Sequence, residues 1–479
     1  MSTEFRSYYS IILTLCLVEF MATVDSSIIL IALPTIAEYF NATTSEAAAV
    51  QLCYLLFLTS VLMIFGKITD KIGPRRAYLL GQIVFLTGSI FCGVAPNILL
   101  LIAARCLQGV GGAMLMVTAY AVVIQFIPLT LRGRVLSMIL VAAALGLMLG
   151  APLGGLLTGY LSWRWLFFIN IPLGLFILFL TQRTLSSADD PPLSQFFREP
   201  FNFWNALLSF ASIALLFYGL GAGHELGWRS TPILGSLIIS LVSAVILIYR
   251  EMRYPDPFLD MNLLKNRYFL FGLLGFLMVV MVQSGTGFLL PFYLELVKHL
   301  EPQQNGLLMI IISGCYALLG PVAGKIVDEW SPRGLCIIAA GLLGGACLMF
   351  SGTLAISGLF WVIIALAWLG ATFSLFQVPA EYLLMSFAHS ENQGKVSGMF
   401  NFILAIGAGV GISITETLFS GYLPNTGHGS LANAGLPVEV LTNGFRHMFI
   451  WAAVASFIAM SFCFLARVNP QPASKLEGH

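Results

Sequence analysis

Residues 66–76 read GKITDKIGPRR, and residues 324–334 read GKIVDEWSPRG. The two stretches are identical at six of eleven positions, at a constant offset of 258 residues. The identical pairs are Gly66/Gly324, Lys67/Lys325, Ile68/Ile326, Asp70/Asp328, Pro74/Pro332 and Arg75/Arg333. Each copy follows the second apolar segment in a block of six such segments, so the repeat predicts a chain built from two related halves.

The apolar segments are long enough to cross a membrane. The chain is 58% hydrophobic and only 9% charged, with a mean hydropathy of +0.91, whereas a soluble domain carries about 25% charged residues. A spanning helix needs about 20 mostly apolar residues. We therefore expect an all-α polytopic membrane protein with fourteen transmembrane helices, near residues 8–33, 47–66, 77–96, 99–126, 135–159, 164–183, 202–221, 231–249, 268–296, 304–325, 334–353, 359–384, 396–420 and 446–467.

The basic residues of the predicted loops test this count. With a cytoplasmic N-terminus, eighteen of them fall in inner segments and four in outer ones, a strong positive-inside bias. The outer four are Arg164, Arg229, Lys298 and Arg446, and the inner eighteen are Arg6, Lys67, Lys71, Arg75, Arg76, Arg132, Arg134, Arg183, Arg198, Arg250, Arg253, Lys265, Arg267, Lys325, Arg333, Lys395, Arg467 and Lys475. A missed span would shift every later loop to the other side of the membrane and remove this bias. We therefore expect both termini in the cytoplasm.

The order of the segments predicts six helices, two inserted helices and six more. We place an N-terminal six-helix bundle at residues 1–185, a central linker with the two inserted helices at 186–267, and a C-terminal six-helix bundle at 268–479. Two parallel halves around a midplane site are typical of secondary transporters. The sequence has no GxxxxGK[ST] phosphate loop, so we expect no cofactor and an ion gradient as the energy source.

One carboxylate interrupts the first span. Residues 22–34 read ATVDSSIILIALP, which places Asp25 roughly 13 Å inside the outer end of its helix, at about 1.5 Å per residue. Arg105 lies at nearly the same depth in LLIAARCLQGVGGAML (100–115). Charged groups at such depths have partners, so we expect Asp25 to pair with Arg105 and to bind and release a proton. A purely structural role for either residue stays open.

Two further polar residues are candidates for lining a substrate cavity. The repeat offset places Gln283 opposite Asp25. Gln283 is not ionisable, as expected if only the first half handles the proton. Glu19 lies six residues before Asp25 and about 240° around the helix, so the two carboxylates need not share a face. For Glu19, cavity lining and helix contact are both open. Glu295, Glu416 and Glu381 lie near helix ends, where solvation at the membrane interface explains them.

The repeated loop is a candidate gate. Its glycines permit a tight turn, and its acidic and basic side chains can make charge-assisted contacts with neighbouring helix ends in one conformation only. The residues are Gly66, Asp70, Gly73, Arg75 and Arg76 in the first copy and Gly324, Asp328 and Arg333 in the second. Topogenic positive charge alone would explain the arginines, but neither Asp70 nor the second copy.

The fifth span contains GLMLGAPLGGLLTG (146–159). Gly146, Gly150 and Gly154 stand four apart on one helix face and allow a neighbouring backbone to approach closely, while Pro152 bends the helix. Simple tight packing is the alternative to a functional role.

These motifs together resemble the major facilitator superfamily, and more narrowly its fourteen-helix branch of drug:proton antiporters. VDSSIILIALPTIA (24–37) resembles the first-helix signature of that branch, and RCLQGVGGA (105–113) resembles its Arg-containing fourth-helix motif. SWRWLFFINIPLG (162–174) is close to the tryptophan-arginine-tryptophan and asparagine-proline pattern of the branch. GKITDKIGPRR resembles the superfamily's loop between helices two and three.

The fifth span resembles the antiporter motif of the family with one departure. The family has a glycine-proline pair where this sequence reads Gly150-Ala151, with the proline one place later at Pro152. The motif residues carried over by the resemblance are Gly146, Gly150, Pro152, Gly154 and Gly155. The resemblance implies that Asp25 is a protonation site with Arg105 as its charge partner, and that Asp70 with Arg75 forms the inner gate.

The resemblance implies a proton-coupled exporter of lipophilic or amphiphilic small molecules that works by alternating access. We expect a multidrug efflux antiporter, monomeric and multi-pass in the bacterial inner membrane, whose partners are an amphiphilic substrate, protons and the bilayer. Export of an endogenous lipid, siderophore or metabolite by the same mechanism is the alternative. No basic patch with interleaved aromatics points to nucleic acid.

Other protein classes fit the sequence less well. An intramembrane enzyme would need a nucleophile with its base or a set of metal ligands, and the sequence has no HExxH motif and no His or Cys cluster. A channel would need a continuous polar pathway, and a receptor would need sizeable extramembrane domains. We therefore expect a transporter without enzymatic activity or a metal site.

Overall fold

The computed structural model describes residues 8–185, 203–252, 261–354, 358–387, 393–423 and 436–466. These residues form helices joined by short loops, without a strand among them. The helices of the first half are α2 (Tyr9–Phe40), α3 (Thr44–Ile72), α4 (Pro74–Gly93), α5 (Ile98–Phe126), α6 (Leu129–Tyr160), α7 (Trp165–Phe168) and α8 (Asn170–Thr184).

The later helices include the two inserted ones and a second set. The inserted pair is α9 (Phe203–Gly221) and α11 (Thr231–Glu251), with the short α10 (Gly223–Leu226) between them. The remaining helices are α12 (Met261–Lys265), α13 (Arg267–Leu296), α14 (Pro302–Glu329), α15 (Pro332–Thr353), α16 (Phe360–Met385), α17 (Gln393–Gly421) and α18 (Val438–Leu465).

Thirteen helices of the described chain are long and apolar enough to cross a membrane. The sixth predicted span, 164–183, is α7 followed by α8, which together count as one of these. Helix α9 falls short of the others because its apolar stretch covers only Leu207–Gly221. The predicted number of fourteen therefore stays a prediction, and so do the three domain boundaries.

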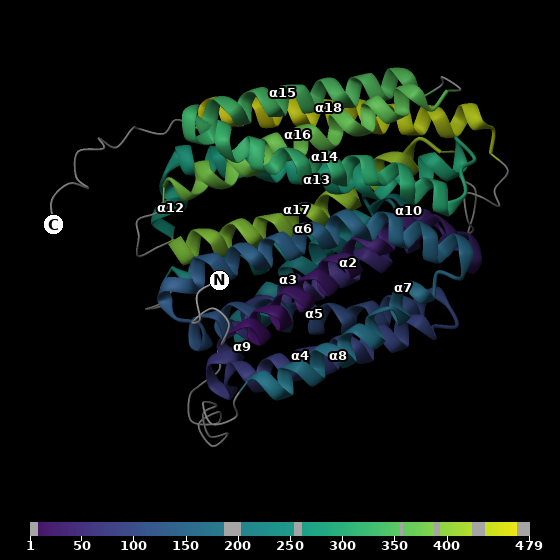
Figure 1. Cartoon of the computed structure of the whole chain (residues 1–479). Coiled ribbons are helices and arrows are strands. Elements are labelled where there is room, and N and C mark those ends of the chain that lie inside the picture. The colour runs from purple at the N-terminus through teal and green to yellow at the C-terminus, as the bar shows by residue number, and fades with distance from the viewer. Residues whose placement is uncertain are drawn as a thin grey trace.

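The helices lie side by side, with α2–α8 in the lower part of Figure 1 and α13–α18 in the upper part. In the first half α2 packs on α6, and α5 packs on α3 and α4. In the second half α13 packs on α17, α14 on α16, and α15 on α18. Helices α9 and α11 pack on each other, and α9 contacts both α3 and α17. The inserted pair thus lies against the line where the two halves meet.

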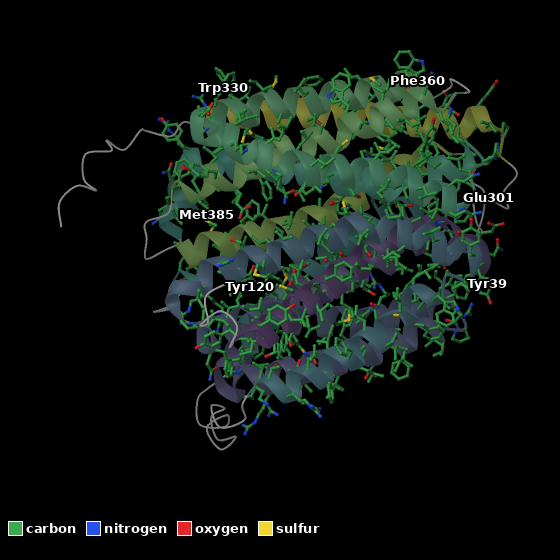
Figure 2. The ribbon with its side chains drawn as sticks, in the orientation of Figure 1. Tyr39, Tyr120, Glu301, Trp330, Phe360 and Met385 are labelled. Atoms are coloured by element: carbon green, nitrogen blue, oxygen red, sulfur yellow. The ribbon has the colours of Figure 1, made fainter. Side chains whose placement is uncertain are left out.

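The spanning helices alternate in direction. Figure 2 shows Tyr39, Glu301 and Phe360 at one end of the bundle, and Trp330 and Met385 at the other. In the predicted topology the first group lies outside the membrane and the second group in the cytoplasm. We call these two ends the outer and the inner end.

The two halves touch at the outer end. Ser45 of α3 donates a hydrogen bond of 2.7 Å to Glu416 of α17. At a separate contact between the halves, a Cβ added at Gly155 of α6 would lie 2.8 Å from the Cα of Gly306 in α14, so these two backbones are in close contact. Glu416 is only 1% exposed. Solvation at the interface was therefore the wrong explanation for this carboxylate.

Two hydrophobic cores match this arrangement. One core includes Ile28 and Ala32 of α2 together with Leu290 and Tyr293 of α13, so it spans both halves. The other surrounds Tyr78 and contains buried residues of the first half alone. Since that second core contains inner-end segments of α2, α4 and α5, the halves share their described core mainly toward the outer end.

The first copy of the repeated loop is mostly helical. Helix α3 continues through Gly66 to Ile72, and α4 begins at Pro74. Only Gly73, with φ of 90°, forms the turn between them, because this backbone conformation favours a residue without Cβ. Gly324 likewise lies inside α14. Of the glycines expected to permit a tight turn, Gly73 forms one, whereas Gly66 and Gly324 lie within helices.

Candidate functional site

Asp25 lies in a cluster of hydrogen-bond donors in the interior of the first half. Its Oδ2 forms an ion pair with Arg105 Nη1 at 2.9 Å. Its Oδ1 accepts from Gln108 Nε2 at 2.8 Å and from Asn170 Nδ2 at 2.7 Å. Asp25 is 1% exposed and Arg105 is fully buried. The structure thus brings together the two charges that the sequence places at matching depth, and both oxygens of the carboxylate accept hydrogen bonds.

The guanidinium of Arg105 also contacts several neutral partners. Nη1 also donates to Gln108 Oε1 at 2.6 Å, and Nη2 donates to Gln51 Oε1 at 3.0 Å. Nε donates to the carbonyl oxygen of Val50 at 3.4 Å. The ring of Tyr54 lies 4.1 Å from the guanidinium carbon, a cation–π distance. These contacts fix the arginine in one orientation, and its planar fork matches several acceptors at once.

Glycines of α4 and α5 allow this cluster to form. A Cβ at Gly109 of α5 would lie 2.5 Å from the carbonyl oxygen of Tyr54 on α3. A Cβ at Gly88 of α4 would lie 2.7 Å from the Cα of Gln108. Because larger residues would separate the helices, these glycines let α3 and α4 approach α5 closely enough for short polar contacts.

Three partners of the pair were not predicted as site residues. Gln108 and Asn170 fall within the quoted motifs RCLQGVGGA and SWRWLFFINIPLG, and Gln51 lies near the start of α3. All three are amides within apolar stretches. That signal could have selected them, since a polar side chain in a spanning helix needs a partner. Their positions around each helix could not be derived from depth alone.

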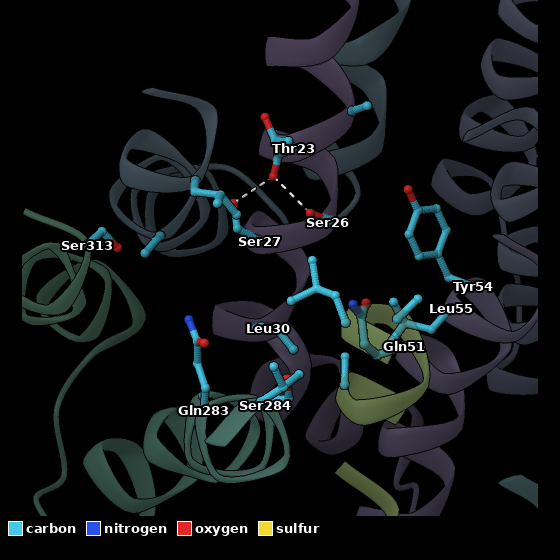
Figure 3. A pocket seen from close by; sticks show the side chains of 18 of the residues that line it. Thr23, Ser26, Ser27, Leu30, Gln51, Tyr54, Leu55, Gln283, Ser284 and Ser313 are labelled. Atoms are coloured by element: carbon cyan, nitrogen blue, oxygen red, sulfur yellow. Dashed lines mark hydrogen bonds between the residues drawn. The ribbon is translucent and has the colours of Figure 1, made fainter. Parts of the chain in front are cut away.

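A cavity of about 440 Å³ lies between the two halves. Most of its lining residues are apolar and come from α2, α3, α5 and α6 on one side and α13, α14, α16 and α17 on the other. Figure 3 shows Ser26 and Ser27 of α2, Gln51 of α3 and Gln283 of α13 around this space. A mostly apolar pocket with a few convergent polar groups is typical of a small-molecule site.

Both residues predicted to line a cavity do so. Glu19 and Gln283 face this space from opposite halves, and Glu19 is the one acidic side chain among its described lining residues. Asp25 and Arg105 do not belong to that lining, although Gln51 and Tyr54 do. The polar lining residues are Glu19, Thr23, Ser26, Ser27, Gln51 and Tyr54 from the first half and Gln283, Ser284, Thr286, Ser313, Tyr316 and Gln377 from the second.

The glycine face of α6 packs against α2. A Cβ at Gly146 or Gly150 would overlap the hydroxyl groups of Thr23 or Ser27, and one at Gly154 would lie 2.7 Å from the carbonyl oxygen of Ile28. The close approach expected for these glycines is therefore made to the helix that carries Asp25.

A second face of α6 meets the other half. There Gly155 lies against Gly306 of α14, so α6 is in contact both with the helix of Asp25 and with the second half. Pro152 lies inside α6 between Gly150 and Gly154.

The candidate gate residues lie apart from this cluster. Arg75, at the start of α4, donates from Nε to the carbonyl oxygen of Leu185 at 2.8 Å, and Arg76 follows it in the same helix. In the second half Arg333 donates to the carbonyl oxygen of Phe464. The side chains of Asp70 and Asp328 lie outside the described residues, although their backbones belong to α3 and α14.

The family follows from a comparison with known sequences. The sequence profile of the Major Facilitator Superfamily matches residues 15–412. The chain belongs to this superfamily. Together with its thirteen membrane-length helices, this makes it an integral multi-pass membrane protein, and its curated bacterial relatives place it in a bacterial membrane.

Curated superfamily members resemble the chain over most of its length. The riboflavin transporter RibZ of Clostridioides difficile is 29% identical over 87% of this chain and 89% of its own length. The multidrug resistance protein Stp of Mycobacterium tuberculosis is 28% identical over 85% of this chain and 75% of its own. The uncharacterized transporter YebQ of Escherichia coli is 29% identical over 89% and 93%.

A solved structure shares the superfamily fold. It is a bacterial homologue of the human lysosomal transporter Spinster, solved in an inward-facing and occupied conformation. The TM-score is 0.67, with 17% identity, over 98% of this chain and all of the other. This similarity supports the fold.

Proposed function

We propose that this superfamily member is a proton-coupled antiporter that exports amphiphilic small molecules from the cytoplasm. The observation that carries the proposal is the buried Asp25–Arg105 pair, 2.9 Å apart, whose arginine contacts the cavity-lining residues Gln51 and Tyr54. A buried carboxylate pairs with its arginine when ionised and loses the pairing when it takes up a proton. Occupancy by a proton therefore changes the contacts of α2 with α5.

The cavity suits an amphiphile better than a strongly polar solute. Its apolar walls can bury the body of a ligand, while amides and hydroxyls at a few positions fix its orientation. The carboxyl group of Glu19 would favour a ligand with a positive charge. The name of the relative Stp, a multidrug resistance protein, supports this class of cargo.

The outer contacts support a transport cycle that starts from the inside. In this structure Ser45 bonds to Glu416 and Gly155 packs on Gly306, which closes the outer end. We propose that a ligand from the cytoplasm enters the cavity while the outer end is closed. The two halves then rock about the cavity. Release outside would coincide with protonation of Asp25, and the gate residues of the two repeated loops would close the inner end.

A second cargo class has its own support. The relative RibZ is a riboflavin transporter and matches nearly the full chain, and the cavity carries three amides, Gln51, Gln283 and Gln377. Amides can pair with the donors and acceptors of a planar heterocycle. Export of an endogenous metabolite by the same proton cycle is therefore the second candidate.

Transport by purified protein in liposomes tests the proposal. With an acid interior, wild-type protein should accumulate ethidium or riboflavin inside, and nigericin, which collapses the pH gradient, should stop this. Asp25→Asn should remove gradient-driven accumulation. Uptake that is equal with and without the gradient would contradict proton coupling, and a preference between the two probes would decide the cargo class.

A further inference from the structure

Helix α3 contributes side chains both to the cavity and to the surroundings of the buried ion pair. Two of its side chains, Gln51 and Tyr54, line the cavity and also contact the guanidinium of Arg105. Both are almost fully buried, with exposures of 4% and 1%. A ligand in the cavity therefore meets these two side chains, whereas Asp25 and Arg105 do not line the cavity.

Of these two side chains, Gln51 is the one that accepts a hydrogen bond from Arg105. Its Oε1 accepts from Arg105 Nη2 at 3.0 Å, and the other guanidinium nitrogen, Nη1, bonds to Asp25 and to Gln108. The guanidinium thus divides its donors between the carboxylate and a side chain of the cavity wall. Figure 3 shows Gln51 beside Tyr54 and Leu55 on the cavity side of α3.

We propose that Gln51 is the positioning residue through which a ligand in the cavity and a proton on Asp25 exclude each other. A ligand with a hydrogen-bond donor that engages Gln51 Oε1 takes this acceptor from Arg105. The guanidinium then directs more of its charge to Asp25, which favours the ionised carboxylate. The proton leaves Asp25 as the ligand binds.

The reverse order follows from the same contacts. When Asp25 is protonated, Arg105 loses its anionic partner and relies on Gln51 and the Tyr54 ring. Gln51 is then less available to a ligand, so protonation weakens binding by the same factor as binding weakens protonation. This inference rests on the proposed antiport, and it assigns the coupling to one amide.

The matched control lies on the other side of the cavity. Gln283 of α13 is also an amide that lines the cavity, but it lies in the opposite half from Arg105. Gln283→Met removes the same chemical group as Gln51→Met, with a side chain of similar length. Gln51→Ala is a second variant in case the methionine impairs folding.

The experiment measures the dissociation constants of ethidium and riboflavin, both of which carry hydrogen-bond donors, against pH, with purified protein in detergent. If one proton is displaced, the constant for a bound probe should change about tenfold per pH unit in the wild type. Gln51→Met and Gln51→Ala should reduce this to less than about twofold per unit, with similar affinity at alkaline pH. Gln283→Met should keep the tenfold dependence even if its affinity falls.

The other outcomes distinguish the role of Gln51 from the proposed antiport. A tenfold dependence that survives in both Gln51 variants and is absent in Asp25→Asn would overturn the role of Gln51 and leave the antiport standing. A dependence that survives in Asp25→Asn would overturn the role of Asp25 as the proton site, on which the proposed function and this inference both rest. If neither probe binds the wild type, both proposals are overturned.

Discussion

The interiors of the two halves differ in chemistry. In the first half Asp25 and Arg105 are surrounded by amides at hydrogen-bonding distance. In the second half Tyr293, Phe350 and Phe449 form an aromatic cluster, with ring centroids 5.6 Å apart for the first pair and 4.3 Å for the second. At the repeat position of Asp25, Gln283 faces the cavity instead. A proton can change the contacts of the first interior, whereas the aromatic cluster contains no carboxylate and no basic side chain.

This difference assigns separate tasks to the halves. We expect the first half to respond to protonation and the second to provide a rigid partner against which it moves. If so, substitutions in the polar cluster should change both stability and coupling. Substitutions in the aromatic cluster should change stability alone.

The largest effect is expected at Arg105. Arg105→Met would leave Asp25 buried without its cation, and breaking a buried pair in this way costs about 3–5 kcal/mol of folding free energy. Thermal unfolding in detergent should show a large loss of stability, smaller at acid pH where a protonated carboxyl carries no charge. Arg105→Lys should recover part of the stability, since it keeps the charge but not the fork. An unchanged melting temperature in Arg105→Met would mean that the stability of the protein is no more sensitive to substitutions in the polar interior than to substitutions in the aromatic one.

A smaller effect is expected where the halves meet. Glu416 accepts from Ser45 and Ser420 at 2.7 and 2.6 Å, and a hydrogen bond to a charged group contributes about 1.5–3 kcal/mol. Glu416→Ala should weaken the outer closure and speed amide hydrogen exchange at the outer ends of α3 and α17 by about tenfold for each 1.4 kcal/mol lost.

Thr417 supplies the control for this experiment. It lies beside Glu416 but bonds to the Leu220 carbonyl of α9 at 2.9 Å. Thr417→Val should leave exchange at α3 unchanged. Equal exchange in the wild type and in Glu416→Ala would contradict a role for this carboxylate in holding the outer end closed.

The smallest effect is expected in the aromatic cluster. Phe350→Leu removes the stacked pair with Phe449 and the edge contact with Tyr293, each worth about 0.5–1.5 kcal/mol. The melting temperature should fall modestly, while the pH dependence of ligand binding should stay at its wild-type slope. A changed slope would show that the second half takes part in proton coupling, and the proposed division of tasks would be wrong.

The sequence predicted the family fold and the principal charges of the site. Apolar run lengths and loop charges defined most spans, because the bilayer constrains helix length and charge position strongly. The pairing of Asp25 with Arg105 followed from depth along two helices, which is a simple function of residue number.

The rest of the site depends on how each helix is rotated about its axis and on how closely the helices approach one another. Residue number gives neither. Gln51, Gln108 and Asn170 come from three different helices, and their side chains meet only because glycines such as Gly109 bring those helices close. Glu416 lies near a helix end in the sequence, where solvent is expected. Its burial depends on the packing of α17 against α3. The residues in contact there belong to different halves and are more than 350 positions apart in the chain.

Proton release on ligand binding tests the central claim most directly. Purified wild-type protein in weakly buffered detergent solution should release about one proton per bound ethidium or riboflavin. Asp25→Asn should release none, while Glu19→Gln, which alters the acidic side chain of the cavity itself, should still release it. Undiminished release from Asp25→Asn, together with its loss in Glu19→Gln, would move the proton to the cavity carboxylate and contradict the account.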